Sequence, residues 1–175
     1  MNGPVRCAVL TISDRAAAGQ REDVSGPALV KEIHALAWEL VGAETVSDER
    51  AGIERVLKAW ADAGSVDVIL TTGGTGFAVR DQTPEATQAV IERPAPGLAE
   101  AIRAASLREN PHSMLSRGTA GIRGRTLIVN LPGNPRGARQ SFEIIRPALP
   151  HAVDLLRGDP KAESGHLRRT PSGRA

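Results

Sequence analysis

One short run of this sequence has the residue types of a phosphate-binding loop, namely Thr71-Thr72-Gly73-Gly74-Thr75-Gly76. It overlaps the end of Val66–Thr72 (VDVILTT), an apolar, β-branched run typical of a buried strand. Its glycines let the backbone turn sharply and point successive N–H groups at one place, and its threonine hydroxyls can add donors. The run is neither a Walker A loop nor a dinucleotide fingerprint, because Gly-Lys-Ser/Thr and the G-x-G-x-x-G spacing are both absent. A tight structural turn is the alternative interpretation.

Charged residues near this run suit a metal-assisted reaction of phosphates. Arg80 and Asp81 come just after it, and Asp48 follows an earlier predicted strand, which can bring it to the same edge of the sheet. Mg²⁺ favours one or two carboxylates together with substrate phosphates, so Asp48 and Asp81 are predicted metal ligands and Arg80 a predicted phosphate contact. The alternatives are a solvated ion pair for Arg80 and Asp81 and a helix N-cap for Asp48.

Three further polar sites are candidates for substrate binding. Ser13 and Asp14 end the first apolar run, where ordinary turn chemistry is an equally good interpretation. The turn Pro132-Gly133-Asn134 ends the last apolar run, and it could frame a flat heterocycle or simply begin a helix. Ser116, in Leu-Ser-Arg-Gly, offers a hydroxyl in a predicted loop, with plain surface polarity as the alternative.

The elements that must hold these residues alternate along the chain. Apolar, β-branched runs predict strands over Val5–Ile12, Val66–Thr72 and Thr126–Leu131, and a short strand is expected to end over Glu44–Val46. Strands separated by helical segments form βα units, so we predict an α/β fold with a mostly parallel sheet covered by helices on both faces. In such folds ligands bind beyond the carboxyl ends of the strands, where most of the candidate residues lie.

Helices are predicted from apolar spacing and from capping residues. Ser25 is the expected N-cap of one helix, and Thr83 of another that runs to Ile91. The polar segment from Ser13 to Val24 is predicted to be a mobile loop. The other expected segments are helices over Gly97–Arg108 and Arg136–Leu156, the second kinked or split by its prolines, and a hairpin or loop over residues 110–125.

Composition narrows the classes of function. The chain has 175 residues, 41% of them hydrophobic and 24% charged, which suits one domain with a sizeable core. A net charge of +2 and an aromatic content of 2% predict neither a basic nucleic-acid-binding patch nor a stacking platform. A lone cysteine excludes an internal disulfide, and neither a membrane-spanning run nor a signal peptide is evident. We therefore expect a cytoplasmic protein with no nucleic-acid partner and no membrane association.

Several of these motifs occur together and in order, which makes a family resemblance specific. From about Val5 to Gly158, the motifs TTGGTGF, RDQTPEAT, PGL, LSR and RTLIVNLPGNP resemble the molybdopterin adenylyltransferase family. These are the MogA/MoaB-like domains, related to domains of gephyrin and of the plant molybdenum-insertase fusion protein. The resemblance implies a three-layer α/β/α, molybdopterin-binding-domain-like fold that is usually a homotrimer and uses ATP with Mg²⁺.

The resemblance also implies roles at matching positions. The family's two essential aspartates match Asp48, preceded here by serine where the family usually has proline, and Asp81. Its binding serine matches Ser116, its phosphate-binding turn matches Gly73–Gly76, and its Asn-Leu-Pro-Gly-Asn-Pro turn matches Asn130–Pro135. By this resemblance the terminal phosphate of molybdopterin attacks the α-phosphorus of ATP, and pyrophosphate leaves.

Two alternatives remain open within this resemblance. A MoaB-type paralogue could bind the pterin without turnover, and a scaffold of the same fold could deliver cofactor to a molybdenum insertase. Competence-damage proteins also carry related domains with different chemistry, but normally beside a further domain. Residues 1–158 are predicted to form the single domain, and residues 159–175 a polar, disordered tail.

Overall fold

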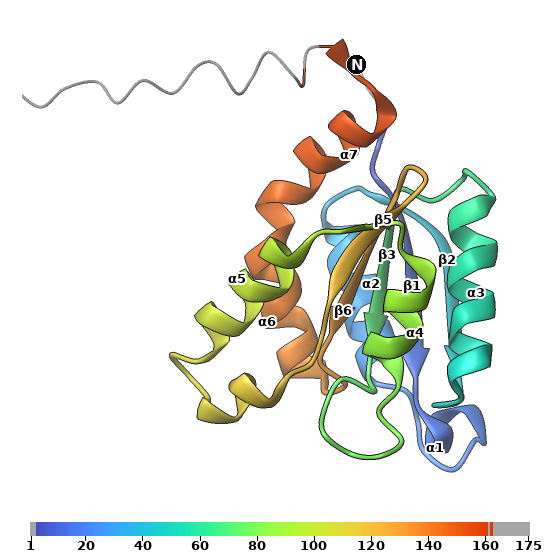
Figure 1. Cartoon of the computed structure of the whole chain (residues 1–175), viewed down its shortest axis with the longest axis vertical. Helices are drawn as coiled ribbons and strands as arrows, with labels where there is room; N and C mark the ends of the chain where they lie inside the picture. The colour runs from blue at the N-terminus through green and yellow to red at the C-terminus, as the bar shows by residue number, and fades with distance from the viewer. Residues whose placement is uncertain (1–2, 161, 163–175) are drawn as a thin grey trace, which may run out of the picture.

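Six strands form one sheet between two layers of helices, as Figure 1 shows for the computed structural model of this chain. Residues 3–160 and 162 are described. The strands are β1 (Arg6–Ile12), β2 (Glu39–Val46), β3 (Val68–Thr72), β4 (Arg93–Pro94), β5 (Ala120–Arg123) and β6 (Thr126–Leu131). The helices are α1 (Asp14–Ala17), α2 (Ser25–Ala35), α3 (Arg50–Asp62), α4 (Thr83–Val90), α5 (Pro96–Ser106), α6 (Pro135–Ile145) and α7 (Leu149–Arg157), with 3-10 segments η1 (Pro111–Leu115) and η2 (Arg146–Ala148). No described helix is long and apolar enough to cross a membrane.

The sheet is mostly parallel, as predicted. Its strand order is β2-β1-β3-β6-β5-β4. β1 pairs in parallel with β2 and β3, and β3 pairs in parallel with β6. β5 runs antiparallel to both β6 and β4. Because the four parallel strands run the same way, the turns that follow them gather at one edge of the sheet.

Alternate residues of the buried strands face two separate cores. Cys7 and Val9 of β1 pack in a core with α2, α5, α6 and α7, whereas Ala8 and Leu10 pack in a second core with α3 and α4. Burial on both faces explains why these strands are continuous apolar runs rather than alternating ones. The α/β/α arrangement predicted from the sequence is therefore confirmed.

Some predicted boundaries differ from the structure. β2 is eight residues long, whereas only its last three positions were predicted, because a strand at the sheet edge has exposed positions and no apolar run. Residues 13–24 were expected to be a loop, but they begin with the short helix α1, in which the Ala16 N–H donates to the side chain of the N-cap Ser13. In both places the residues are exposed, so the element has no apolar pattern from which it could be predicted.

Other boundaries agree with the predictions. The long carboxyl-terminal helix is split into α6, η2 and α7 at its prolines. Residues 110–125 contain η1 and then β5, which forms a hairpin with β6. The tail predicted over residues 159–175 lies, apart from residues 159, 160 and 162, outside the described residues.

The predicted helix caps Ser25 and Thr83 are wrong, and so is the alternative interpretation of Asp48 as a helix N-cap. Ser25 and Thr83 are the first residues of their helices, and the N-cap of α3 is Glu49 rather than Asp48. Each of the three side chains hydrogen-bonds a group other than the helix it was expected to cap. Their partners are the Asp23 carboxylate, the Gly73 carbonyl and the Asp14 N–H, respectively.

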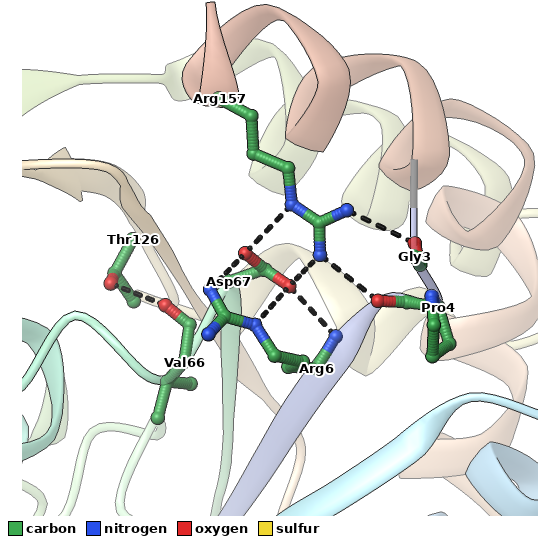
Figure 2. Close-up of polar contacts among 7 residues, drawn as sticks. All are labelled: Gly3, Pro4, Arg6, Val66, Asp67, Thr126 and Arg157. Carbon is green, nitrogen blue, oxygen red and sulfur yellow. Dashed lines mark hydrogen bonds and ion pairs between the residues drawn. The ribbon is translucent and has the colours of Figure 1, made fainter. Parts of the chain in front are cut away.

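At the amino ends of the strands, Asp67 joins three segments that are distant in sequence (Figure 2). Its side chain is only 5% exposed. Its carboxylate accepts hydrogen bonds from the backbone N–H of Arg6 at 2.8 Å and from the Arg6 guanidinium at 2.9 and 3.1 Å. Arg157, the last residue of α7, donates to the same carboxylate and to the carbonyls of Gly3 and Pro4. One buried carboxylate therefore holds the amino-terminal segment, the sheet and the last helix together.

We expect Asp67→Asn to lower the free energy of unfolding by roughly 3 kcal/mol, because removing one partner of a buried ion pair leaves the other charges uncompensated. Urea unfolding measures this loss. Asp62→Asn is the matched control, since Asp62 pairs with Arg123 at an exposed position and such pairs contribute about 0–1 kcal/mol. Equal losses in the two variants would contradict the role given to Asp67.

The same carboxylate has a pH signature. Burial opposes its ionisation, but the hydrogen bonds from Arg6 and Arg157 outweigh burial and lower the pKa of Asp67 below its ordinary value of 3.8. A carboxyl group with a lower pKa in the folded state stabilises the fold above the unfolded value and loses this effect as pH falls through the folded value. Below pH 3.8, the unfolding free energy of the wild type should therefore fall more steeply than that of Asp67→Asn.

Candidate functional site

The sheet has a switch point between β1 and β3. The chain places β2 on one side of β1 and β3 on the other, so connections leave in opposite directions at this point. In parallel α/β sheets a crevice opens there, beyond the carboxyl ends of the strands. Ser13 and Asp14 follow β1 at this edge, and the glycine turn follows β3.

The glycine turn is tight because strand ends touch through their backbones. Gly73 has φ +108°, and a Cβ atom there would lie 2.2 Å from the carbonyl oxygen of Ile12. A Cβ atom on Gly133 would lie 2.9 Å from the Cα of Gly73. The hydroxyl of Thr83 donates to the Gly73 carbonyl at 2.8 Å, and its N–H donates to the Gly74 carbonyl at 3.2 Å. The turns after β1, β3 and β6 therefore form one packed unit with the start of α4.

Two reciprocal hydrogen bonds hold Asp14 and Asp48 together beside this turn. The N–H of Asp14 donates to the Asp48 carboxylate at 2.7 Å, and the N–H of Asp48 donates to the Asp14 carboxylate at 2.9 Å. Arg80 donates to both oxygens of Asp14 at 2.8–3.1 Å and to Glu49 at 2.7 Å. The guanidinium of Arg80, predicted to contact a phosphate, is thus already paired with two carboxylates.

Asp48 and Asp14 have opposite pKa shifts. Burial raises the pKa of Asp48, the charges of Asp14 and Asp81 raise it further, and the Asp14 N–H and Arg80 oppose this only in part. The hydrogen bond with the Asp48 backbone and those with Arg80 lower the pKa of Asp14. Asp48 therefore lies within reach of two other negative charges, an arrangement that a bound cation would relieve.

The carboxylates of Asp48 and Asp81 point at two glycines of the turn. A Cβ atom on Gly74 would lie 3.3 Å from Asp48 Oδ1, and one on Gly76 would lie 2.9 Å from Asp81 Oδ2. Within residues 3–160 and 162, no three His, Cys, Asp or Glu side chains are grouped to hold a metal. Two carboxylates still fit Mg²⁺, which takes its remaining ligands from water and substrate phosphates. The predicted pair is therefore brought to the predicted turn.

A pocket of about 860 Å³ opens beside the glycine turn, between the end of α5, η1 and the start of α6. Six of the predicted residues line it, namely Thr75, Gly76, Ser116, Pro132, Gly133 and Asn134. A Cβ atom on Gly76 would also lie close to the Asp81 carboxylate, so Gly76 is near both the pocket and the acidic group. The predicted residues therefore form two neighbouring sites, an acidic one and an open pocket.

Two predicted residues have a structural part in this arrangement. Thr72 is fully buried, and its hydroxyl donates to the Pro132 carbonyl at 2.7 Å, so it ties β3 to the turn after β6. Asn134 accepts the N–H of Gly137 at 2.7 Å and so caps α6. Asn134 still lines the pocket, whereas Thr72 does not.

Some residues at the site could not be singled out from the sequence. Ser106, Glu109 and Gln140 line the pocket from α5, the segment after it, and α6. A polar residue on a helix is usually solvated, so only the packing of these helices reveals its position. Arg117, the arginine of the Leu-Ser-Arg-Gly motif, donates to the carbonyls of Gly76 and Asp81 and pairs with Glu85.

Comparison with known proteins agrees with this geometry. Residues 8–151 match the family described as "Probable molybdopterin binding domain". The molybdopterin adenylyltransferase of Helicobacter pylori is 43% identical over 157 residues, which cover 89% of both chains. The molybdenum cofactor synthesis protein cinnamon of Drosophila melanogaster is 44% identical over 152 residues, covering 86% of this chain but 25% of that protein. The crystal structure of the molybdopterin biosynthesis enzyme MoaB from Thermus thermophilus has a TM-score of 0.83 and 49% identity, covering 89% of this chain and 98% of that one.

The packing of the glycine turn can be tested with alanine substitutions at two glycines that both have positive φ. Gly74 and Gly64 both have positive φ, +62° and +70°, but only a Cβ atom on Gly74 would meet other groups, at 2.4 Å for the Thr83 hydroxyl. Gly64→Ala should cost about 1–2 kcal/mol of unfolding free energy from backbone strain. Gly74→Ala should cost about 1–3 kcal/mol more from overpacking. Equal losses in chemical denaturation would show that the turn is not packed as described.

Proposed function

This chain belongs to the molybdopterin-binding-domain family, and we propose that it is a molybdopterin adenylyltransferase, which transfers AMP from ATP to the terminal phosphate of molybdopterin. The observation that carries the proposal is the position of two carboxylates, Asp48 and Asp81, at a glycine turn beside a pocket. The name of the Helicobacter pylori relative, which matches this chain over 89% of both lengths, supports the same activity.

The two neighbouring sites match the two substrates of this reaction. The pocket of about 860 Å³ has room for a pterin with its phosphate chain, and its polar lining offers hydrogen bonds to a heterocycle. The glycine turn, with Ser13 and Asp14 at its side, is where we place the phosphates of ATP. Gly76 lies where the two sites meet, so the molybdopterin phosphate would reach the α-phosphorus of ATP near this residue.

The proposed reaction requires mainly that the two substrates be aligned. An oxygen of the molybdopterin phosphate forms a bond to the α-phosphorus of ATP, and the bond from this phosphorus to the bridging oxygen breaks, releasing pyrophosphate. Asp48 and Asp81 would hold Mg²⁺, which offsets the charge of the phosphates. The chain's own residues bind and orient two polyanions, and such positioning accounts for a large share of the rate in phosphoryl-type transfers. No nucleophilic side chain is required.

A non-catalytic domain of the same fold is the second candidate, because the Thermus thermophilus structure with 49% identity is a MoaB. Incubation with molybdopterin and Mg-ATP distinguishes the two. Adenylylated molybdopterin and pyrophosphate, measured by chromatography, support the transferase. Tight binding of molybdopterin without pyrophosphate release supports the pterin-binding or delivery role instead.

The assembly and surroundings of the enzyme are also proposals. The family resemblance supports a homotrimer, which light scattering can test. A molybdenum insertase is the proposed partner, supported by cinnamon, a molybdenum cofactor synthesis protein of which this chain matches only a quarter of the length. The single buried thiol, Cys7, is in keeping with the proposed cytoplasmic location.

The carboxylate pair can be tested without disturbing the fold. We expect Asp81→Asn and Asp48→Asn each to lower AMP transfer about 100-fold or more, because an amide keeps the shape but not the charge that binds a metal. In Asp48→Asn the new amide oxygen can still accept the Asp14 N–H, so melting temperature and molybdopterin binding should stay near those of the wild type. The matched control is Glu54→Gln, which neutralises a carboxylate paired with Arg50 on the surface of α3. Full activity in both aspartate variants would reject the proposed metal site.

A further inference from the structure

Arg117 spans the base of the segment that carries Asp81, residues 76–81, which we call the Asp81 loop. Its backbone N–H donates to the Thr75 carbonyl at 2.9 Å, just before the loop. Its Nε donates to the carbonyl of Gly76 at 2.7 Å, and its Nη2 donates to the carbonyl of Asp81 at 2.5 Å. Its Nη1 pairs with the carboxylate of Glu85 in the first turn of α4. One guanidinium therefore holds both the first and the last residue of the loop.

The rest of the Asp81 loop is exposed and is held by few other groups. Residues 77–80 are all exposed. Within the loop, the N–H of Asp81 donates to the Ala78 carbonyl at 2.9 Å, and the N–H of Ala78 donates to the Asp81 carboxylate at 3.0 Å. These bonds shape the loop but do not attach it to the sheet. The loop is attached to the rest of the chain by Arg80, which pairs with Asp14 and Glu49, and by Arg117 at the base. The side chain of Gln82 also donates to the Val79 carbonyl at 3.0 Å.

Glu85 supplies the negative charge that Arg117 needs. The carbonyls of Gly76 and Asp81 accept hydrogen bonds but carry no net charge, so they do not neutralise a guanidinium. Glu85 Oε1 pairs with Arg117, and Glu85 Oε2 is buried without a hydrogen-bond partner among the described residues. A carboxylate in this position is oriented by one partner alone. Its pairing with Arg117 therefore links the start of α4 to the Asp81 loop.

We propose that Arg117 is a positioning residue, which holds the Asp81 carboxylate at the glycine turn and connects it to the pocket wall through the adjacent Ser116. This inference rests on the proposed function, since it assigns the positioned carboxylate to Mg²⁺. Ser116 lines the pocket, and Arg117 follows it directly in the chain. The same short segment thus contacts the proposed molybdopterin site and the proposed metal site.

The test compares Arg117→Ala with a matched control, Arg123→Ala. Arg123 also pairs with a carboxylate, that of Asp62, and donates to a carbonyl, that of Val90, and its side chain is 23% exposed against 33% for Arg117. Removing a residue that orients a metal ligand typically lowers metal affinity or activity roughly 10–100-fold. We expect Arg117→Ala to lower kcat and raise the Mg²⁺ midpoint within this range, with little change in the KM for molybdopterin. Arg123→Ala should change neither quantity.

Hydrogen exchange provides a readout that is independent of turnover. Amides of residues 77–82 should exchange faster in Arg117→Ala than in the wild type or in Arg123→Ala. Free guanidinium added at low concentration should restore part of the activity of Arg117→Ala only. Arg117→Lys keeps the charge but cannot span both carbonyls, so it should show a smaller shift of the Mg²⁺ midpoint, and it carries the test if the alanine variant does not fold.

Two results would overturn the inference. One is unchanged exchange in residues 77–82 after removal of Arg117, and the other is a loss of stability with an unchanged Mg²⁺ midpoint. Either result would mean that Arg117 only connects the segment after η1 to α4 and does not position Asp81. Failure of the wild type to transfer AMP would instead reject the proposed function, and the exchange comparison would still decide whether Arg117 holds the loop.

Discussion

The site depends on a contact between backbones, that of Gly73 with Ile12 and Gly133. No side chain fits at Gly73, where a Cβ atom would overlap the Ile12 carbonyl. A Cβ atom on Gly133 would in turn overlap the Cα of Gly73. The ends of β1, β3 and β6 can therefore approach until their main chains touch. As a consequence, the candidate functional side chains belong to the residues just beyond these contacts. Their positions are determined mainly by the backbone and less by the choice of rotamer. Such backbone-defined positions tolerate little movement.

The two edges of the sheet use aspartate for opposite purposes. At the amino edge, Asp67 is surrounded by two guanidinium groups, and its pKa is lowered. At the carboxyl edge, Asp48 is half-buried near two other carboxylates, and its pKa is raised. The first arrangement lowers the energy of the folded chain by itself. The second brings like charges together, as is common where residues are placed for function rather than for stability.

Much of the fold could be predicted from the sequence, because β1, β3 and β6 are buried on both faces and therefore appear as apolar runs. The exposed edge strand β2 leaves a weaker pattern and was predicted only in part. The helix caps were wrong for a different reason. Ser25, Thr83 and Asp48 are residue types that often cap helices, but each side chain hydrogen-bonds a group outside its helix. The nearby sequence does not show which of these hydrogen bonds forms.

The candidate site divides in the same way. Residues that end parallel strands could be predicted, since the topology alone brings Asp14 and the glycine turn to one edge. The pocket could not, because Ser106 and Gln140 are ordinary polar residues until two helices pack side by side.

The charge balance at the carboxyl edge constrains how ATP could bind. Asp14, Asp48 and Glu49 lie close together with one guanidinium, that of Arg80, paired to two of them. Like charges a few ångströms apart repel appreciably even with partial screening by water. A triphosphate placed on the glycine turn would add to this repulsion, and the N–H groups of the turn offset only part of it. In the proposed reaction, binding of the nucleotide and binding of a cation would therefore be coupled at this edge. The pocket lies on the other side of Gly76 and includes none of these carboxylates, so occupation of the pocket need not follow the same coupling.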